Sequence, residues 1–148
     1  MMKHKFKIIK LFFICFTFFI IGTVFGFSDN KTVYYEPAHV ELIGVVNTML
    51  FPGPPNYNSI DNGDVAEYGW YLKLDQTVDV KLTHNAAKGT NDVPEDNVNF
   101  IQIVDSNKNH WKRYKNGNHI KVTGTLFHAM FGHHHALVLI NVESVELD

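Results

Sequence analysis

The chain has 148 residues, of which 45% are hydrophobic, with 13 Lys and Arg against 15 Asp and Glu. That length suits one domain, and the charge balance argues against nucleic acid as a partner, because nucleic-acid-binding domains present a basic patch. The single cysteine excludes a disulfide framework, so the fold must be stabilised by a packed core.

The first 28 residues have the pattern of a secretory signal peptide. Met1 to Lys10 carries four lysines and no acidic residue, and Leu11 to Gly26 is almost wholly apolar. A basic segment followed by a short apolar one is typical of a signal peptide, whereas a membrane-spanning helix needs about 20 apolar residues. We therefore expect cleavage near Gly26 or Ser28, which would leave no membrane span. An uncleaved membrane anchor is the alternative.

Export would place the remaining chain in the periplasm or outside the cell. Cleavage removes Cys15 and four lysines, which leaves 9 Lys and Arg against 15 Asp and Glu. A mildly acidic domain of this kind again lacks the electrostatic properties of a nucleic-acid-binding protein. We expect the polar residues 29–37 to form a flexible arm and residues 38–148 to form one domain.

Alternation of apolar and polar side chains predicts a series of short strands in this domain. The expected strands are Val40 to Asn47, Tyr68 to Leu74, Val78 to Leu82, Val98 to Val104, Ile120 to Phe127 and Leu137 to Leu147. Asp105 or Ser106 can cap a short helix that reaches about Tyr114. Gly44, inside the first strand, predicts a bend or bulge.

This order of elements predicts a mainly β fold, a small OB-like Greek-key barrel of five or six strands with one short helix. A β-sandwich is the alternative, because alternating strands alone do not distinguish two packed sheets from a closed one. In an OB-like barrel, the loop after the first strand and the loop before the last strand flank the binding face. Here these loops are residues 48–67, which are rich in proline, and residues 128–135, which hold four of the nine histidines.

The two loops supply the candidate ligand-binding residues, and we expect them to meet at one end of the barrel. The candidates are Asn56, Tyr57 and Ser59 from the first loop and His128, His133, His134 and His135 from the second. The alternative is that the histidines are packing and hydrogen-bonding groups at the mouth of the barrel.

The register of the last hairpin decides which histidines face each other. A three-residue loop, Met130-Phe131-Gly132 with a left-handed Gly132, matches the apolar faces of the two strands. His128 then faces His134, and His133 and His135 point to the other face, because successive side chains of a strand alternate. A slip of one residue would pair His128 with His135 instead.

A zinc or copper site is a further alternative for the same histidines. Neighbouring side chains on a strand cannot grip one ion, so the site would need a pair completed by other ligands. The pairs are His128 with His134 and His133 with His135, and the completing ligands would come from His39, His110, Asp61 and Asp64. Apart from such an ion, we expect no cofactor.

The chain lacks the motifs of common catalytic sites. It has no serine or cysteine elbow and no glycine-rich phosphate loop beside the histidines. We therefore expect no catalytic residues and no enzymatic activity.

Three motifs are distinctive. They are Gly53-Pro54-Pro55-Asn56-Tyr57-x-Ser59-Ile60, Val122-x-Gly124-x-Leu126 and Gly132-His133-His134-His135-x-x-Val138-Leu139. Together they resemble an uncharacterised family of small exported bacterial domains, labelled a domain of unknown function, over roughly Val40 to Val145. Members typically have Thr where this chain has Ala136. The resemblance implies an envelope or secreted setting and a β-barrel, and it implies no activity.

These observations predict an exported, non-catalytic binding module of the bacterial envelope. Its ligand, an envelope polymer or another protein, would contact the proline-rich loop and the histidine loop. The alternative function is that of a divalent metal (zinc or copper) binding protein that uses the histidine cluster.

Overall fold

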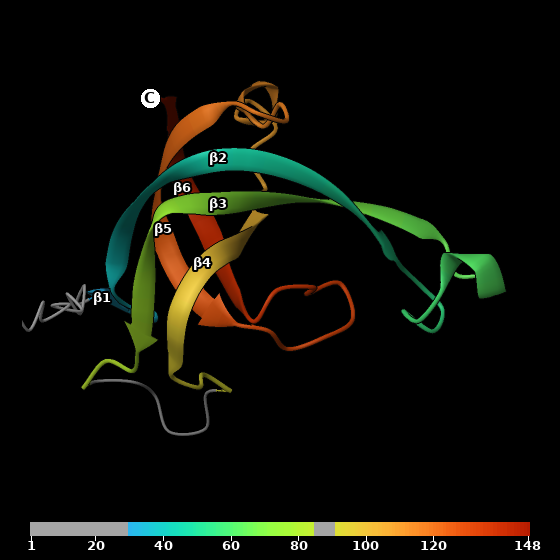
Figure 1. Cartoon of the computed structure of the whole chain (residues 1–148), viewed down its shortest axis with the longest axis horizontal. Coiled ribbons are helices and arrows are strands. Elements are labelled where there is room, and N and C mark those ends of the chain that lie inside the picture. The colour runs from blue at the N-terminus through green and yellow to red at the C-terminus, as the bar shows by residue number, and fades with distance from the viewer. Residues whose placement is uncertain (1–29, 85–90) are drawn as a thin grey trace, which may run out of the picture.

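The computed structural model describes residues 30–84 and 91–148, and the described chain consists mainly of β-strands (Figure 1). The strands are β1 (Lys31–Tyr34), β2 (His39–Pro52), β3 (Ala66–Lys81), β4 (Glu95–Val104), β5 (His119–His128) and β6 (Val138–Leu147). Two single 3-10 turns accompany them, η1 (Ile60–Asn62) and η2 (Trp111–Arg113). The predicted signal peptide, residues 1–28, lies outside the described residues.

Five of the strands close into a barrel. The sheet order is β1-β3-β2-β5-β6-β4, and a further pairing of β3 with β4 joins the two sides of the sheet. Strands β4 and β6 pair in parallel, whereas the other neighbours within the barrel are antiparallel. The predicted OB-like Greek-key barrel is therefore confirmed. The β-sandwich alternative is wrong, because one sheet closes on itself.

The core lies inside this barrel and follows from the alternation in the sequence. On β5, for example, Ile120, Val122 and Leu126 are buried, while Lys121, Thr123 and Thr125 between them are half-buried. The core cluster comprises Val33, Tyr35, Val40, Leu42, Val46, Leu72, Leu74, Val78, Val80, Ile101, Ile103, Tyr114, Ile120, Val122, Leu126, Val138, Ile140 and Val145. Burial of such side chains, at about 25 cal/mol per Å² of apolar surface, is the main stabilising contribution to the fold.

The segment predicted to be a flexible arm is part of the fold. Its residues Lys31–Tyr34 form β1, which pairs in parallel with Val78 to Lys81 of β3. Val33 and Tyr35 are buried in the core, and Tyr35 bridges to Leu126 of β5. The prediction of a flexible arm is therefore wrong for these residues, because two alternating apolar side chains anchor an otherwise polar segment.

Three further expectations needed correction. The predicted strands 68–74 and 78–82 are one strand, β3, with register shifts near Val78 where it bends around the barrel. The predicted helix is reduced to the single turn η2, beside which the Tyr114 hydroxyl donates a hydrogen bond to the buried Asp105 carboxylate. Gly44, where a bend or bulge was expected, instead permits β2 to approach β3 closely, since a Cβ there would lie 2.2 Å from the carbonyl oxygen of Lys73.

The β2–β3 hairpin extends beyond the barrel as a two-stranded arm (Figure 1). Strand β5 pairs with β2 only as far as Val45, and β4 pairs with β3 only from Trp70 onward. Residues 49–52 and 66–69 therefore pair only with each other, and they carry loop 53–65 to the tip of the arm. Within the described residues, no helix is long and apolar enough to cross a membrane.

Candidate functional site

Loop 53–65 is organised around the carboxylate of Asp64, which is buried. Asp64 Oδ1 accepts hydrogen bonds from the backbone N–H and the side-chain amide of Asn56, at 2.9 and 3.1 Å. Its Oδ2 accepts from the backbone N–H groups of Asn58 and Ser59, at 2.8 and 2.9 Å. The backbone donors of Ser59, Asn58 and Asn56 stabilise the charged carboxylate and hold the pKa of Asp64 below its usual value.

This network includes two of the predicted ligand-binding residues, Asn56 and Ser59. Asn56 directs its side-chain amide to Asp64, so it stabilises the loop. Ser59 also donates its backbone N–H to Asp64. The polar residues of the Pro-rich motif therefore explain the shape of the loop, and only Tyr57 projects from it toward the other predicted loop.

Tyr57 joins the two loops. Its backbone adopts a positive φ of 55°, with its N–H bonded to the Gly53 carbonyl oxygen at 3.0 Å. Its hydroxyl lies 2.9 Å from Nε2 of His133, and the two rings meet edge to face with centroids 5.1 Å apart. Loop 53–65 and loop 129–137 are therefore in direct contact through these two side chains.

Glu67 on β3 is the second partner of His133. Its Oε1 lies 2.6 Å from His133 Nδ1. When the carboxylate accepts the Nδ1 proton, Nε2 is left as the acceptor for the Tyr57 hydroxyl. Hydrogen bonds to Tyr57 and Glu67 thus orient the His133 imidazole from both sides, as the partners of a functional histidine commonly do.

His135 packs against the outer face of the barrel and not against His133. Its ring stacks on Phe51 of β2, with centroids 4.3 Å apart and an interplanar angle of 5°. Its backbone N–H donates to Oε1 of Gln102 at 2.7 Å, and Ala136 donates to the same oxygen at 3.3 Å. The Gln102 amide in turn donates to the His133 carbonyl oxygen at 2.9 Å. Gln102 on β4 therefore holds loop 129–137 against the barrel.

The predicted register of the last hairpin is wrong. His128 pairs with Val138, so the connection is the nine-residue loop 129–137 and not Met130-Phe131-Gly132. His133, His134 and His135 lie in this loop, where strand alternation does not apply. Neither predicted register occurs, and the facing of His128 with His134 is wrong as well. The faces of the strands were predicted correctly, since Leu126 pairs with Ile140.

The sequence predicted a left-handed backbone at Gly132, but the structure gives a different reason for this glycine. It is not among the residues with positive φ. A Cβ at this position would lie 2.7 Å from Cδ2 of the Tyr57 ring, which is closer than real Cβ atoms approach. The Gly of the histidine motif and the Tyr of the proline motif are therefore explained by one contact.

His128 and His134 each have separate partners. His128 Nε2 lies 3.1 Å from Oε1 of Glu95 on β4. His134 Nδ1 accepts the backbone N–H of Met130 at 3.0 Å, and its ring lies against Phe131 with centroids 4.1 Å apart. Burial lowers the pKa of His134, with smaller contributions from the neighbouring histidines, so its ring is neutral at pH 7.

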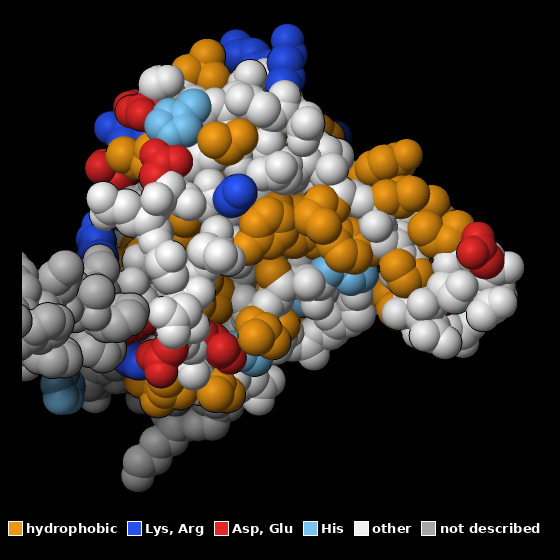
Figure 2. Space-filling model, in the orientation of Figure 1, with side chains coloured by type: hydrophobic (Ala, Val, Ile, Leu, Met, Phe, Trp, Pro, Cys, Tyr) orange, Lys and Arg blue, Asp and Glu red, His pale blue; other side chains and the backbone are white. Residues whose placement is uncertain are grey.

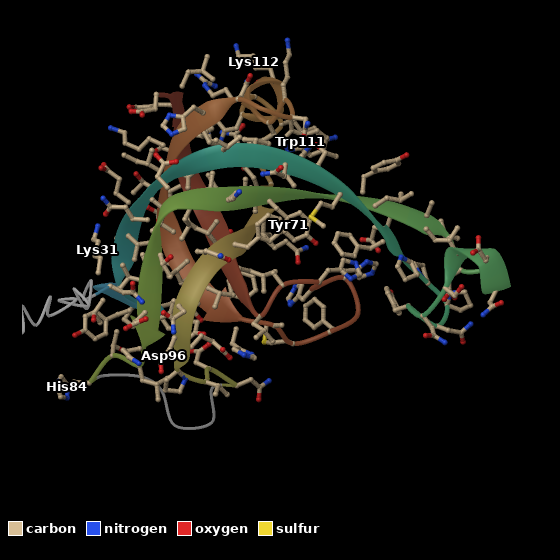
Figure 3. All side chains as sticks on the ribbon, viewed as in Figure 1. Lys31, Tyr71, His84, Asp96, Trp111 and Lys112 are labelled. Carbon is tan, nitrogen blue, oxygen red and sulfur yellow. The ribbon has the colours of Figure 1, made fainter. Side chains whose placement is uncertain are left out.

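Three buried polar atoms lie without a hydrogen-bond partner near this junction. They are Oε2 of Glu67, Nε2 of His135 and the hydroxyl oxygen of Tyr71, whose side chain is almost fully buried. Glu67 Oε2 and His135 Nε2 are 3.9 Å apart. Burial, followed by the charge of Glu67, raises the pKa of Tyr71. Figure 3 shows Tyr71 beside β3, on the side of the barrel from which the arm projects.

The histidines do not gather into the predicted metal-binding pairs. Among the described residues, no group of three or more His, Cys, Asp or Glu side chains could hold a metal ion. Each suggested completing ligand also lies elsewhere: His39 pairs with Glu143, His110 pairs with Asp105, Asp64 binds its own loop, and Asp61 is exposed in η1. The pair of side chains that most resembles part of a metal site is Glu67 with His135, a pair that sequence reasoning did not identify.

The hydrogen-bonded residues Tyr57, His133 and Glu67 lie where the two loops meet. The three main cavities in residues 30–84 and 91–148 are lined by none of these three side chains. The largest, about 540 Å³, instead lies on the other side of loop 129–137, where His134 and Phe131 line it.

The comparison with protein families gives a match in the second half of the chain. Residues 100–146 match the model of a domain of unknown function, DUF4431. The predicted resemblance to a domain of unknown function is confirmed at that level. The DUF4431 match runs from β4 into β6 and includes Gln102 and loop 129–137, whereas residues 53–60 lie outside it. Searches of curated proteins and of solved structures found no match.

Sequence reasoning did not identify Gln102, nor Glu67 as a partner of the histidines. Gln102 stands inside the apolar run Phe100 to Val104, and a polar residue on an otherwise apolar strand is the signal that could have identified it. Glu67 follows a turn rich in acids, and nothing in its local sequence distinguishes it from Asp61. Its importance arises from the pairing of β2 with β3, which places it beside Phe51.

Proposed function

We propose that this chain is an exported, non-catalytic binding module of the bacterial envelope. Its ligand would be bound where loop 53–65 and loop 129–137 meet. The observation that carries the proposal is the contact between Tyr57 and His133, with 2.9 Å between Oη and Nε2. OB-like barrels bind ligands on the face of their second and third strands, between the corresponding two loops.

The surface around this contact has the composition of an interaction site. The arm exposes five large hydrophobic residues, Met49, Leu50, Ile60, Val65 and Tyr68. Figure 2 shows hydrophobic side chains across the middle of this face and along the arm, with histidine between them. Contiguous exposed apolar surface of this kind commonly marks a site of protein or ligand binding.

A matched pair of double variants tests the proposal. Immobilised full chain is incubated with a detergent-solubilised bacterial envelope extract, and the retained components are identified. The site variant is Tyr57→Ala/His133→Ala, and the control is Tyr34→Ala/His39→Ala, which removes an exposed Tyr and His elsewhere. We expect wild type and control to retain a component that the site variant loses. Equal recovery from all three chains would contradict the proposal.

The half-buried pair Glu67 and His135 supports metal binding as a second candidate. Their unpartnered Oε2 and Nε2 atoms are 3.9 Å apart, and a tetrahedral zinc ion would hold such atoms about 3.4 Å apart. His133, bonded to the other oxygen of Glu67, would then act as the outer partner that orients a metal-binding carboxylate. The phenol of Tyr71 or a water molecule would supply a further ligand.

Calorimetry with Zn²⁺ and Cu²⁺ on the untagged full chain tests this second candidate. We expect binding with a dissociation constant of about 1 μM or tighter, equivalent to about 8 kcal/mol. Binding should be lost in Glu67→Gln/His135→Gln and kept in Glu143→Gln/His39→Gln, which alters an exposed Glu–His pair. Wild-type binding weaker than about 1 μM, or equal loss in both variants, would remove this candidate.

A further inference from the structure

The largest of the three main cavities lies beneath loop 129–137, on the side away from Tyr57. It has a volume of about 540 Å³, within the range of roughly 300–1,000 Å³ found for ligand sites. Val104, Phe127 and Asn141, from β4, β5 and β6, form one wall, and Met130, Phe131 and His134 of the loop form another. Glu36, Asn91 and Asp92 lie at its third side. The cavity therefore combines apolar walls with an acidic end.

The apolar walls are held in place by contacts within the loop. The His134 ring lies between Phe131 and Phe127, with centroid distances of 4.1 and 5.4 Å. Its Nδ1 accepts the Met130 N–H, and its own backbone N–H donates to the Phe131 carbonyl oxygen at 2.8 Å. Phe131 nevertheless remains 61% exposed. An aromatic ring that is both fixed and exposed can stack with a partner without losing further conformational freedom.

At the acidic end the Asp92 carboxylate is fixed and that of Glu36 is exposed, and within residues 30–84 and 91–148 no lysine or arginine lines the cavity. Asp92 Oδ1 accepts the backbone N–H of His128 at 3.1 Å, and the backbone N–H of Glu36 donates to the Leu126 carbonyl oxygen at 2.8 Å. His134, the remaining titratable group of the lining, is neutral at pH 7. Among the described residues of the lining, a ligand therefore meets two carboxylates and no positively charged side chain.

We propose that this cavity binds an arginine side chain presented by another polypeptide. The planar guanidinium can stack on Phe131 and form charge-assisted hydrogen bonds with Asp92 and Glu36. Its aliphatic stem would cover Phe127 and Met130, as such stems commonly do on apolar surfaces. An anionic ligand would be repelled, and a wholly apolar one would leave the carboxylates desolvated without a partner. A cation with an apolar stem fits both walls.

This inference goes beyond the proposed function because it concerns the opposite side of loop 129–137 and names the chemistry of the partner. Tyr57, His133 and Glu67 do not line the cavity. Failure of the envelope-capture experiment with the Tyr57→Ala/His133→Ala variant would therefore leave this inference unaffected. Likewise, failure to bind arginine would leave the proposed function unaffected.

The test is a ¹H–¹⁵N NMR titration of the full chain with acetyl-Gly-Arg-Gly-amide. The control peptide replaces arginine by citrulline, which keeps the shape and removes the charge. We expect saturable shifts of the Phe127, Met130, Phe131 and Asn141 amides, with binding at least about tenfold weaker for the citrulline peptide. Added salt should weaken the binding, because exposed charges are screened.

Protein variants complete the test. Asp92→Asn/Glu36→Gln should weaken arginine binding at least about tenfold, while the amide oxygen introduced at position 92 would still accept the His128 N–H and so preserve the fold. Asp61→Asn/Glu143→Gln, which neutralises two exposed acids outside the cavity, should bind as wild type does. Equal binding of the two peptides, shifts confined to other residues, or the absence of saturable shifts would each overturn the inference.

Discussion

The ring of Tyr57 occupies the space into which a side chain on Gly132 would project. A Cβ on Gly132 would lie 2.7 to 2.8 Å from Cδ2, Cε2 and Cγ of Tyr57. This contact joins loop 53–65 to loop 129–137 more closely than their hydrogen bond alone would. The two loops therefore behave as one surface, and a change in either should be detected in the other.

Gly132→Ala should consequently destabilise the protein through Tyr57. Because the new methyl group overlaps the ring close to its attachment point, we expect a loss of about 1–3 kcal/mol in the free energy of unfolding. Tyr57→Ala removes the ring, so Gly132→Ala should cost little in that background. Urea unfolding of wild type, both single variants and the double variant measures the coupling. Strictly additive losses would show that the contact does not exist.

Gln102→Leu should release loop 129–137 from the barrel. The substitution removes one donor and one acceptor and leaves the His135 and Ala136 N–H groups without their partner. We expect a loss of about 1–3 kcal/mol, accompanied by faster hydrogen exchange at those two amides. Gln76→Leu, at an exposed position of β3, is the control and should change neither quantity. Unaltered exchange at His135 would refute the role assigned to Gln102.

The barrel could be predicted because its determinants are local, whereas the site depends on contacts between distant residues. Period-two alternation gave the faces of β5 and β6 correctly, including the pairing of Leu126 with Ile140. The hairpin connection was predicted six residues too short, and the actual loop is held by Gln102, which lies 31 residues before His133. Likewise, the sequence did not show that Asp64 accepts hydrogen bonds from the backbone N–H groups of Asn56 and Ser59.

Burial of the N-terminal segment illustrates the same limit. Val33 and Tyr35 are two apolar residues within a polar stretch, too few to predict a strand by themselves. Their burial depends on β3, which pairs with β1 through residues nearly fifty positions later in the sequence. Such pairings are specified by the whole barrel and are not visible in a short window of residues.

The shape of loop 53–65 should depend on pH through Asp64. Its pKa is lowered in the folded state, so the carboxylate contributes stability that is fully present above its unfolded pKa of about 3.9. That contribution is lost as the pH falls through the lower, folded pKa. We expect the amide signals of Asn56, Asn58 and Ser59 to shift below about pH 4. In Asp64→Asn, the same amides should be altered at neutral pH and show no further transition in acid.

His134 and His119 should titrate in opposite directions within the same molecule. Burial lowers the pKa of His134, whereas the hydrogen bond to Asp75 and the nearby Asp148 raise that of His119. Two-dimensional ¹H–¹³C NMR of the ring carbons should therefore give midpoints below 6.5 for His134 and above 6.5 for His119.

Because unfolding allows His134 to take up a proton more readily, its contribution to stability is fully present above pH 6.5 and declines as the pH falls below that value. His119 acts in the reverse sense, since its stabilisation is present below pH 6.5 and is lost as the pH rises through its folded pKa. Replacing His134 with Phe should abolish the loss of stability below pH 6.5 and leave the contribution of His119 unchanged. A His134 midpoint at or above 6.5 would contradict the neutral ring that lines the arginine cavity.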